Sequence, residues 1–217
     1  MEATQRGRPR RFEAGAEREI LLDAGFAAMR RNGYQDASVA DVLKVAGLSA
    51  RAFYRHFPTK DALLLALLRR DALAVAERLQ RAADRADDAE AKLNAWLDGY
   101  LDVFYEPRRA ARVAIFASRA ARRADGYEEE MAATRRMLAA PLADVLRAGA
   151  RAGRITSSRP EHDAAAILAI ATSVCDPLSA AHFTNRHDAG DQVRRFCRPA
   201  LGLGPHPGAG RPGRTRA

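Results

Sequence analysis

The 217-residue sequence predicts an all-α protein, and three observations support this fold class. Alanine and arginine, which are both good helix formers, are abundant. Apolar residues recur at steps of three and four in one segment after another, as they do on one face of a helix. Alternating runs rich in Val, Ile and Thr, which strands favour, are nearly absent. Hydrophobic residues make up 47% of the chain, so a sizeable core can be buried.

Capping signals and apolar periodicity divide the chain into nine helices. Ser38 and Asp41 have the spacing of a capping box, which marks a helix start. Gly33 and Gly47 each follow an apolar-periodic segment and can end it in the left-handed conformation. Pro107 breaks another helix. The expected helices cover about residues 13–32, 38–47, 49–57, 59–82, 88–105, 108–120, 125–152, 161–181 and 188–202.

Positive charge gathers at the two ends of the chain. The formal net charge is +9, of which residues 1–60 contribute +4 and residues 204–217 contribute +3. A basic end on a nearly neutral body suits a polyanion such as DNA, although arginine drift in a GC-rich genome would give the same excess. The arm at Arg6-Gly7-Arg8-Pro9 has the composition of an AT-hook core, so Arg8 and Arg10 are expected in a minor groove. A merely solvated arm is the alternative.

Several classes of function are not expected. The two cysteines, Cys175 and Cys197, have no metal-ligand spacing and are expected to be small buried side chains in a reducing compartment. No signal peptide and no apolar stretch of membrane-spanning length is seen, so a cytoplasmic protein without membrane contact is expected. Nucleophile-elbow, phosphate-loop and zinc-protease motifs are all missing. We therefore expect no enzyme activity, no metal and no cofactor.

Residues 38–57 have the pattern of a helix-turn-helix. Such a pair inserts its second helix into the major groove, where all four base pairs differ. Phe53 and Phe57, four residues apart, should face the core, and small residues at 50 and 52 should allow close approach to DNA. Arg51 can reach a guanine edge with two hydrogen bonds. The residues expected to face outward are Ala50, Arg51, Tyr54 and Arg55.

Phosphate contacts are expected from Tyr54, His56 and Lys60, which would fix the register of the protein without reading sequence. For His56, a core or capping role is the serious alternative. For Lys60, a purely structural role is less natural, because a cation at a helix N-terminus opposes the helix dipole. Ser38 is expected to cap its helix whether or not it also contacts a phosphate.

Residues 15–70 resemble the tetracycline-repressor (TetR) family of bacterial regulators. The resemblance includes Leu21-Leu22-Asp23-Ala24 and Asn32-Gly33-Tyr34. It is strongest in the turn Gly47-Leu48-Ser49, the helix end Phe53-Tyr54-Arg55-His56-Phe57 and the following Pro58-Thr59-Lys60-Asp61-Ala62-Leu63. The chain departs from the family pattern at Met29, where an aromatic residue is usual, at Leu43, where alanine is usual, and at Ala52, where a small hydroxyl or glycine is usual.

This resemblance implies a regulator in two parts. A basic arm (1–12), a DNA-binding domain (13–60), a linking helix (61–82), a ligand-binding and dimerisation domain (83–203) and a basic tail (204–217) are expected. The partners implied are a near-palindromic double-stranded operator, a small-molecule effector that releases it, and a second copy bound through the last two helices. The residues expected at DNA are Arg8, Arg10, Ser38, Val39, Ser49, Ala50, Arg51, Ala52, Tyr54, Arg55, His56, Thr59 and Lys60.

The second domain offers candidates for an effector pocket, although aromatic residues at helical spacing are more often core. These candidates are Trp96, Tyr100, Phe104, Phe116, Met137 and Cys175. Two further functions stay open: a dimeric regulator without an effector, and a broad DNA binder that uses both basic ends. A closed apolar pocket would favour the effector-responsive regulator, a filled core would favour the regulator without effector, and salt-dependent binding without sequence preference would favour the broad binder.

Overall fold

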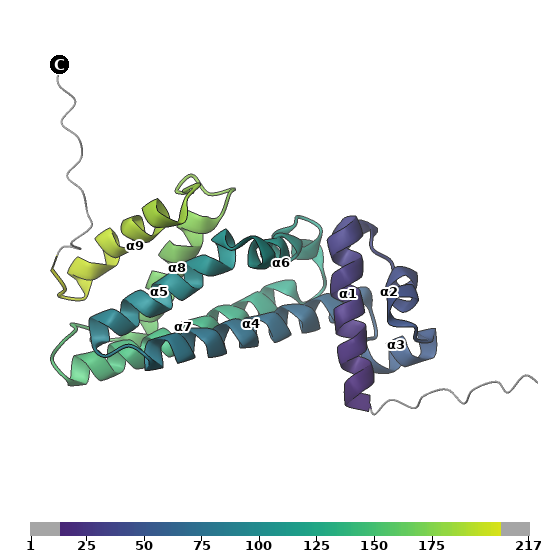
Figure 1. The fold of residues 1–217 in the computed structure, drawn as a ribbon, viewed down its shortest axis with the longest axis horizontal. Coiled ribbons are helices and arrows are strands. Elements are labelled where there is room, and N and C mark those ends of the chain that lie inside the picture. The colour runs from purple at the N-terminus through teal and green to yellow at the C-terminus, as the bar shows by residue number, and fades with distance from the viewer. Residues whose placement is uncertain (1–13, 205–217) are drawn as a thin grey trace, which may run out of the picture.

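A computed structural model describes residues 14–204, and the prediction of an all-α fold is confirmed in this part of the chain (Figure 1). No helix there is long and apolar enough to cross a membrane. The helices are α1 (Ala14–Asp36), α2 (Val39–Ala46), α3 (Ala50–His56), α4 (Lys60–Asp84), α5 (Ala89–Tyr105), α6 (Pro107–Ala117), α7 (Tyr127–Arg151), α8 (Pro160–Cys175) and α9 (Arg186–Ala200), with a short 3-10 helix η1 (Ala121–Arg123).

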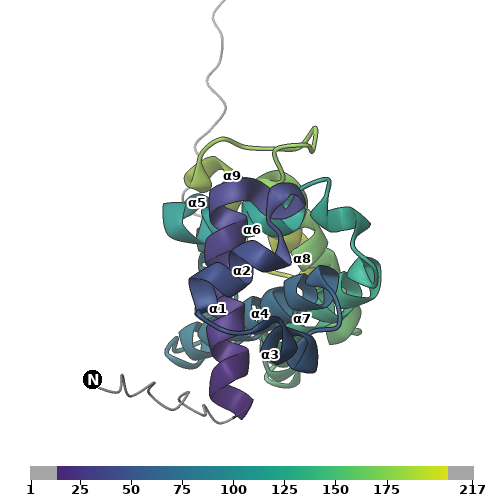
Figure 2. The same cartoon turned by 90° about the vertical axis from the view of Figure 1, so that its right-hand side faces the viewer.

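The helices form a small head at one end of an elongated body. Helices α1, α2 and α3 make up the head, and α4 runs from it along the body beside α7 (Figure 1). Seen from the head end, the three head helices lie in front of the body, with α2 and α3 nearer the viewer than α1 (Figure 2). The last helix, α9, lies in the body, away from the head (Figure 1). The head therefore lies at one end of a bundle formed by the later helices.

All nine expected helices are present, and the largest boundary error is at the end of α8. This helix was expected to continue to residue 181, but it ends at Cys175. Asp176 is extended (φ −78°, ψ 115°) because it precedes Pro177, whose ring disfavours a helical conformation in the preceding residue. At Gly33 the backbone has the expected positive φ (74°), but its ψ of 163° lies outside the left-handed helical region, and one more helical turn follows.

Two hydrophobic cores lie along the molecule, joined by α4. The head core contains Leu21, Leu22, Phe53, Phe57, Leu63, Leu64 and Leu67 among others. Gly25 lets α1 approach α4 closely here, since a Cβ at this position would lie 2.7 Å from the Leu63 side chain. The body core contains Leu79, Trp96, Leu97, Tyr100, Leu101, Leu142, Leu146, Leu168 and Val193 among others.

The head core is completed by residues from the body. The end of α6, η1 and the start of α7 contribute Ile115, Phe116, Ala121, Ala124 and Tyr127 to it. Tyr127 also donates a hydrogen bond from its hydroxyl to the Phe116 carbonyl at 2.9 Å, which joins the start of α7 to the end of α6. The domain limits at residues 60 and 82 stay a prediction. The buried side chains of residues 115–127 pack in the head core and not in the body core.

Candidate nucleic-acid interface

The first helix of the helix-turn-helix, α2, is held by the capping interactions expected from the sequence. The Asp41 amide donates to the Ser38 hydroxyl at 3.1 Å, and the Ser38 amide donates to the Asp41 carboxylate at 2.9 Å. Helix α2 then ends at Gly47, which adopts the left-handed conformation (φ 64°, ψ 27°). Glycine adopts this conformation without the strain a Cβ would cause, so the chain can turn sharply into α3.

Helix α3 presents an inner and an outer face. Phe53 and Phe57 are buried in the head core, while Ala50, Arg51 and Arg55 are exposed and Tyr54 is 58% exposed. Ala52, which was expected to allow close approach to DNA through its small size, is only 6% exposed. A helix buries a stripe about 100° wide, so positions 52, 53, 56 and 57 all turn inward rather than 53 and 57 alone. Ala52 therefore supports packing and offers no surface to a base.

The remaining candidates near α3 are mostly helix caps. The Ser49 hydroxyl accepts a hydrogen bond from the Ala52 amide at 3.2 Å, and the Thr59 hydroxyl accepts one from the Ala62 amide at 3.0 Å. Both residues are exposed, whereas Val39 is half-buried against the head core. Their contacts with DNA stay predictions. Arg8 and Arg10 lie outside the described residues.

Glu17 of α1 braces the end of α3, a role that sequence reasoning missed. The Arg55 guanidinium donates a hydrogen bond to the Glu17 carboxylate, and His56 Nε2 lies 3.3 Å from the same carboxylate. These two bonds, first from Arg55 and then from His56, hold the pKa of Glu17 below its usual value. The geometry favours the structural alternative for His56. No local signal marks Glu17, because it lies 38 residues before Arg55.

Lys60 is bound within the protein, although the dipole of its own helix argues against a purely structural role. Its ammonium leaves the start of α4 and reaches the end of α1, where it donates to the carbonyls of Tyr34 (2.9 Å), Gln35 (3.1 Å) and Ala37 (3.0 Å). The same nitrogen lies 4.5 Å from the centre of the Tyr34 ring. A cation is favourable at a helix C-terminus, and an ammonium has three donors. All three protons of Lys60 are thus engaged within the protein.

A Lys60→Met variant should therefore lose stability more than it loses salt-dependent DNA affinity. Removing the ammonium leaves three carbonyls at the end of α1 without their charged donor, which costs about 1–3 kcal/mol of the free energy of unfolding. Urea denaturation measures this loss, and Lys44→Met, which alters an exposed lysine of α2, is the control. If the salt slope of DNA binding fell by about one with stability unchanged, Lys60 would instead be a phosphate contact.

The candidates for an effector pocket lie in two different places. Phe116 belongs to the head core, while Trp96, Tyr100 and Cys175 are buried in the body core. Phe104 packs against the body core and Met137 is half-buried. Burial raises the pKa of the Cys175 thiol to about 12, so this cysteine stays protonated and acts as a packing residue. Phe116 thus lies in a different core from Trp96, Tyr100 and Cys175, and the packing of these side chains supports the core alternative.

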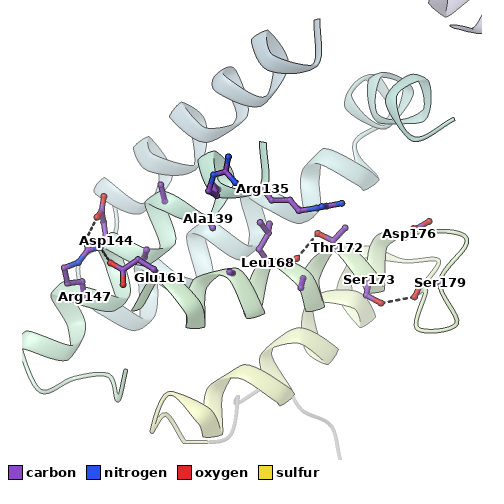
Figure 3. A pocket seen from close by; sticks show the side chains of 15 residues that line it. Arg135, Ala139, Asp144, Arg147, Glu161, Leu168, Thr172, Ser173, Asp176 and Ser179 are labelled. Carbon is purple, nitrogen blue, oxygen red and sulfur yellow. Dashed lines mark hydrogen bonds and ion pairs between the residues drawn. The ribbon is translucent and has the colours of Figure 1, made fainter. Parts of the chain in front are cut away.

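An open groove of about 740 Å³ lies elsewhere, between α7 and α8 (Figure 3). Its floor is formed by small and apolar side chains, among them Ala139, Ala143 and Leu168. At one end Arg147 bridges Asp144 and Glu161, and at the other the Ser173 and Ser179 hydroxyls lie 2.9 Å apart (Figure 3). None of the six predicted pocket residues lines this groove.

Comparison with known proteins supports the resemblance in the head and in the fold. Residues 21–67 match the family model "Bacterial regulatory proteins, tetR family". The HTH-type transcriptional regulator EthR of Mycobacterium tuberculosis is 34% identical over 118 residues, which cover 54% of this chain and 54% of EthR. The chain therefore spans about half the length of this curated relative.

Two solved structures share the overall fold. A TetR-family transcriptional regulator from Pectobacterium atrosepticum superposes with a TM-score of 0.70 at 22% identity, over 92% of this chain and 100% of that one. FadR from Bacillus subtilis, solved in complex with stearoyl-CoA, superposes with a TM-score of 0.65 at 16% identity, over 82% of this chain and 96% of that one. Residues 21–67 therefore resemble the DNA-binding part of that family, and the described residues share the overall fold of solved TetR-family regulators.

Proposed function

We propose that this chain is a dimeric, sequence-specific DNA-binding regulator, and that it is a repressor released from a near-palindromic operator by a small-molecule effector. The outer face of α3 carries this proposal. Arg51 and Tyr54 are exposed on the side of α3 opposite the buried Phe53, as side chains that read a major groove must be. No ion pair among residues 14–204 involves Arg51, whereas neighbouring Arg55 is paired with Glu17.

A homodimer through the last two helices is supported by their exposed surfaces. Helix α8 exposes Ala165, Ala166 and Ala169 on one side, and small side chains allow two helices to approach closely. Helix α9 exposes Phe196 at 56%, and the preceding loop exposes Leu178 at 82%. Large exposed apolar side chains are typical of surfaces that a second chain covers. Two copies joined here would carry two α3 helices, which is why the operator should be near-palindromic.

Two observations support control by an effector: a bound ligand in a protein of the same fold, and a groove on the surface of this chain. FadR, which shares this fold, was solved with stearoyl-CoA bound. In the present chain the groove between α7 and α8 combines an apolar floor with polar ends, and because Ala165 and Ala169 line it, an effector there would lie at the edge of the proposed dimer surface. The dense body core favours a second candidate, a dimeric regulator without effector, because Trp96 and Leu142 are fully buried where an enclosed pocket was expected.

Selection of bound duplexes from random DNA at near-physiological salt tests the DNA-binding function. The expected result is a consensus with two inverted half-sites about one helical turn apart or a multiple of that distance. Ordered, salt-dependent binding without any consensus would contradict the proposal and would favour a broad DNA binder that uses the basic ends. An asymmetric single half-site would contradict the dimer and leave sequence-specific recognition by α3 in place.

A further inference from the structure

A cluster of charged side chains lies where α5 meets α6 and α9, alongside α4. Three carboxylates of this cluster are paired with three guanidiniums. Arg194 lies 2.7 Å from Asp98, Arg186 lies 2.6 Å from Asp102, and Arg109 lies 3.6 Å from Glu106. Each of these three carboxylates is thus paired with an arginine of α6 or α9, and a fourth carboxylate, Asp191 of α9, lies 3.8 Å from Arg194. A fourth arginine, Arg78 of α4, faces the same cluster and adds one positive charge to it.

Arg78 lacks a partner for its charge. No carboxylate of residues 14–204 lies within 4.0 Å of its guanidinium, which donates only a long hydrogen bond of 3.3 Å from Nη2 to the Gly99 carbonyl. Its Nε is buried and has no acceptor among the described residues. Burial lowers the pKa of Arg78, and the positive charges of Arg109 and Arg81 lower it further. The more distant carboxylates of Asp102 and Glu106 oppose this shift without contacting the guanidinium. A half-buried cation beside other cations is costly unless something compensates it.

The packing holds this guanidinium in place. Arg78 is followed by Leu79, a fully buried residue of the body core, so the backbone of α4 is fixed at this point. Gly99 brings α5 close to α4, since a Cβ at Gly99 would lie 2.9 Å from the Leu79 side chain. That close approach sets the Gly99 carbonyl against one proton of Nη2. The Nε proton and the second Nη2 proton remain for another acceptor.

We infer that Arg78 anchors an oxyanion, the carboxylate or phosphate group of a small-molecule ligand, at the junction of α4, α5 and α6. A planar guanidinium edge with two protons matches two oxygens of such a group. Arg109, whose nearest carboxylate contact is a loose 3.6 Å, can contribute a second positive charge. The ligand is therefore expected to carry at least one negative charge.

The position of Arg78 gives this site a route to the head. Asp71 lies two helical turns before Arg78 on the same face of α4, and Arg112 lies one turn after Arg109 on α6. Arg112 donates to the Asp71 carboxylate at 2.5 and 2.7 Å and lies 3.7 Å from the centre of the Phe26 ring of α1. An anion bound between Arg78 and Arg109 would draw α4 and α6 together. The pair of Arg112 and Asp71 joins the same two helices and lies against α1, so this movement would reach the head.

Thermal unfolding without DNA tests the anion site. Sodium acetate and sodium phosphate are the probes, each compared with sodium chloride at equal ionic strength. At about five times the dissociation constant, a bound anion should raise the Tm by about 2–4 °C. The rise should vanish in Arg78→Met and persist in Arg85→Met, which alters an exposed arginine two turns further along, at the C-terminal cap of α4. A response to only one of the two probes identifies which oxyanion the site takes.

Two outcomes would overturn the inference. One is a Tm that follows ionic strength alone in the wild-type protein, and the other is an anion response that survives in Arg78→Met. Without anion, Arg78→Met should melt at or above the wild-type temperature, because an uncompensated charge has been removed. A clear loss of stability would show that the fold itself satisfies the guanidinium and would count against the site.

An anion at Arg78 would define the chemical class of the effector, and this role of the site rests on the proposed function. The melting experiment contains no DNA, so its result does not depend on whether the protein is a repressor. The binding of a labelled operator, chosen by the selection described above, is then measured with and without the anion. If the anion binds at Arg78 and operator affinity stays the same, the anion site stands and its role as effector site is overturned.

Discussion

An Arg51→Ala variant is expected to bind a degenerate operator. Arg51 is exposed on the outer face of α3 and is free of ion pairs within residues 14–204. A guanidinium that donates two hydrogen bonds to a guanine edge discriminates against the wrong base by about 1–3 kcal/mol. A dimer uses the contact twice, so affinity for the preferred operator should fall by about 2–6 kcal/mol in total. Selection from random DNA should show equal base frequencies at one or two positions of each half-site.

The matched control for this variant is Arg151→Ala, which removes an exposed arginine from the far end of α7. It changes net charge equally and should leave the selected consensus intact. An unchanged consensus for Arg51→Ala would show that another part of the head reads the sequence. A uniform loss of affinity for all sequences, with a lower salt slope, would make Arg51 a phosphate contact instead.

Replacing Trp96 with alanine should destabilise the body by about 3–5 kcal/mol. Trp96 is fully buried, stacks on Tyr100 with ring centres 5.4 Å apart, and donates from its indole to the Leu138 carbonyl at 3.3 Å. Alanine would leave a cavity between α5 and α7 and a carbonyl without its donor. Because Trp96 is the only tryptophan, urea unfolding should be followed by far-UV circular dichroism rather than by fluorescence.

Trp96→Phe separates the two contributions to this loss. Phenylalanine keeps a ring against Tyr100 but cannot donate to Leu138, so its loss of stability should be clearly smaller than that of alanine. Equal losses for both variants would mean that the indole hydrogen bond, not ring packing, dominates. A loss below about 1 kcal/mol for alanine would contradict the tight packing of the body core.

Local signals in the sequence predicted the parts of the head that depend on neighbouring residues. The capping box at Ser38 and Asp41 and the turn at Gly47 involve residues only a few positions apart, so their geometry follows from the chain itself. The inward position of Phe53 follows from helical periodicity in the same way. The end of α8 at Cys175 was also predictable from neighbouring residues, because Pro177 disfavours a helical conformation at Asp176.

Contacts between distant segments were not predictable in this way. Lys60 was judged by the dipole of its own helix, whereas its ammonium binds the end of another helix, some 23 to 26 residues earlier. Glu17 acts on residues of α3 that no spacing rule connects to it. The grouping of the pocket candidates was not predictable for a related reason, because Phe116 follows α6 into the head core while Trp96 follows α5 into the body core. In the same way, the sequence does not show that the Arg78 guanidinium lacks a charged partner, because this depends on contacts between helices that are distant in the chain.

The shared packing of the head and the segment from 115 to 127 limits how freely the two ends of this protein can be exchanged. A chimaera that joins this head to the body of a relative would set Leu64 and Leu67 against foreign side chains from α6 and α7. Transfer of residues 14–68 alone would therefore leave an incomplete core, while transfer together with the 115–127 segment would preserve it. Recombination between members of such a family would then favour exchanges that keep both stretches from one parent.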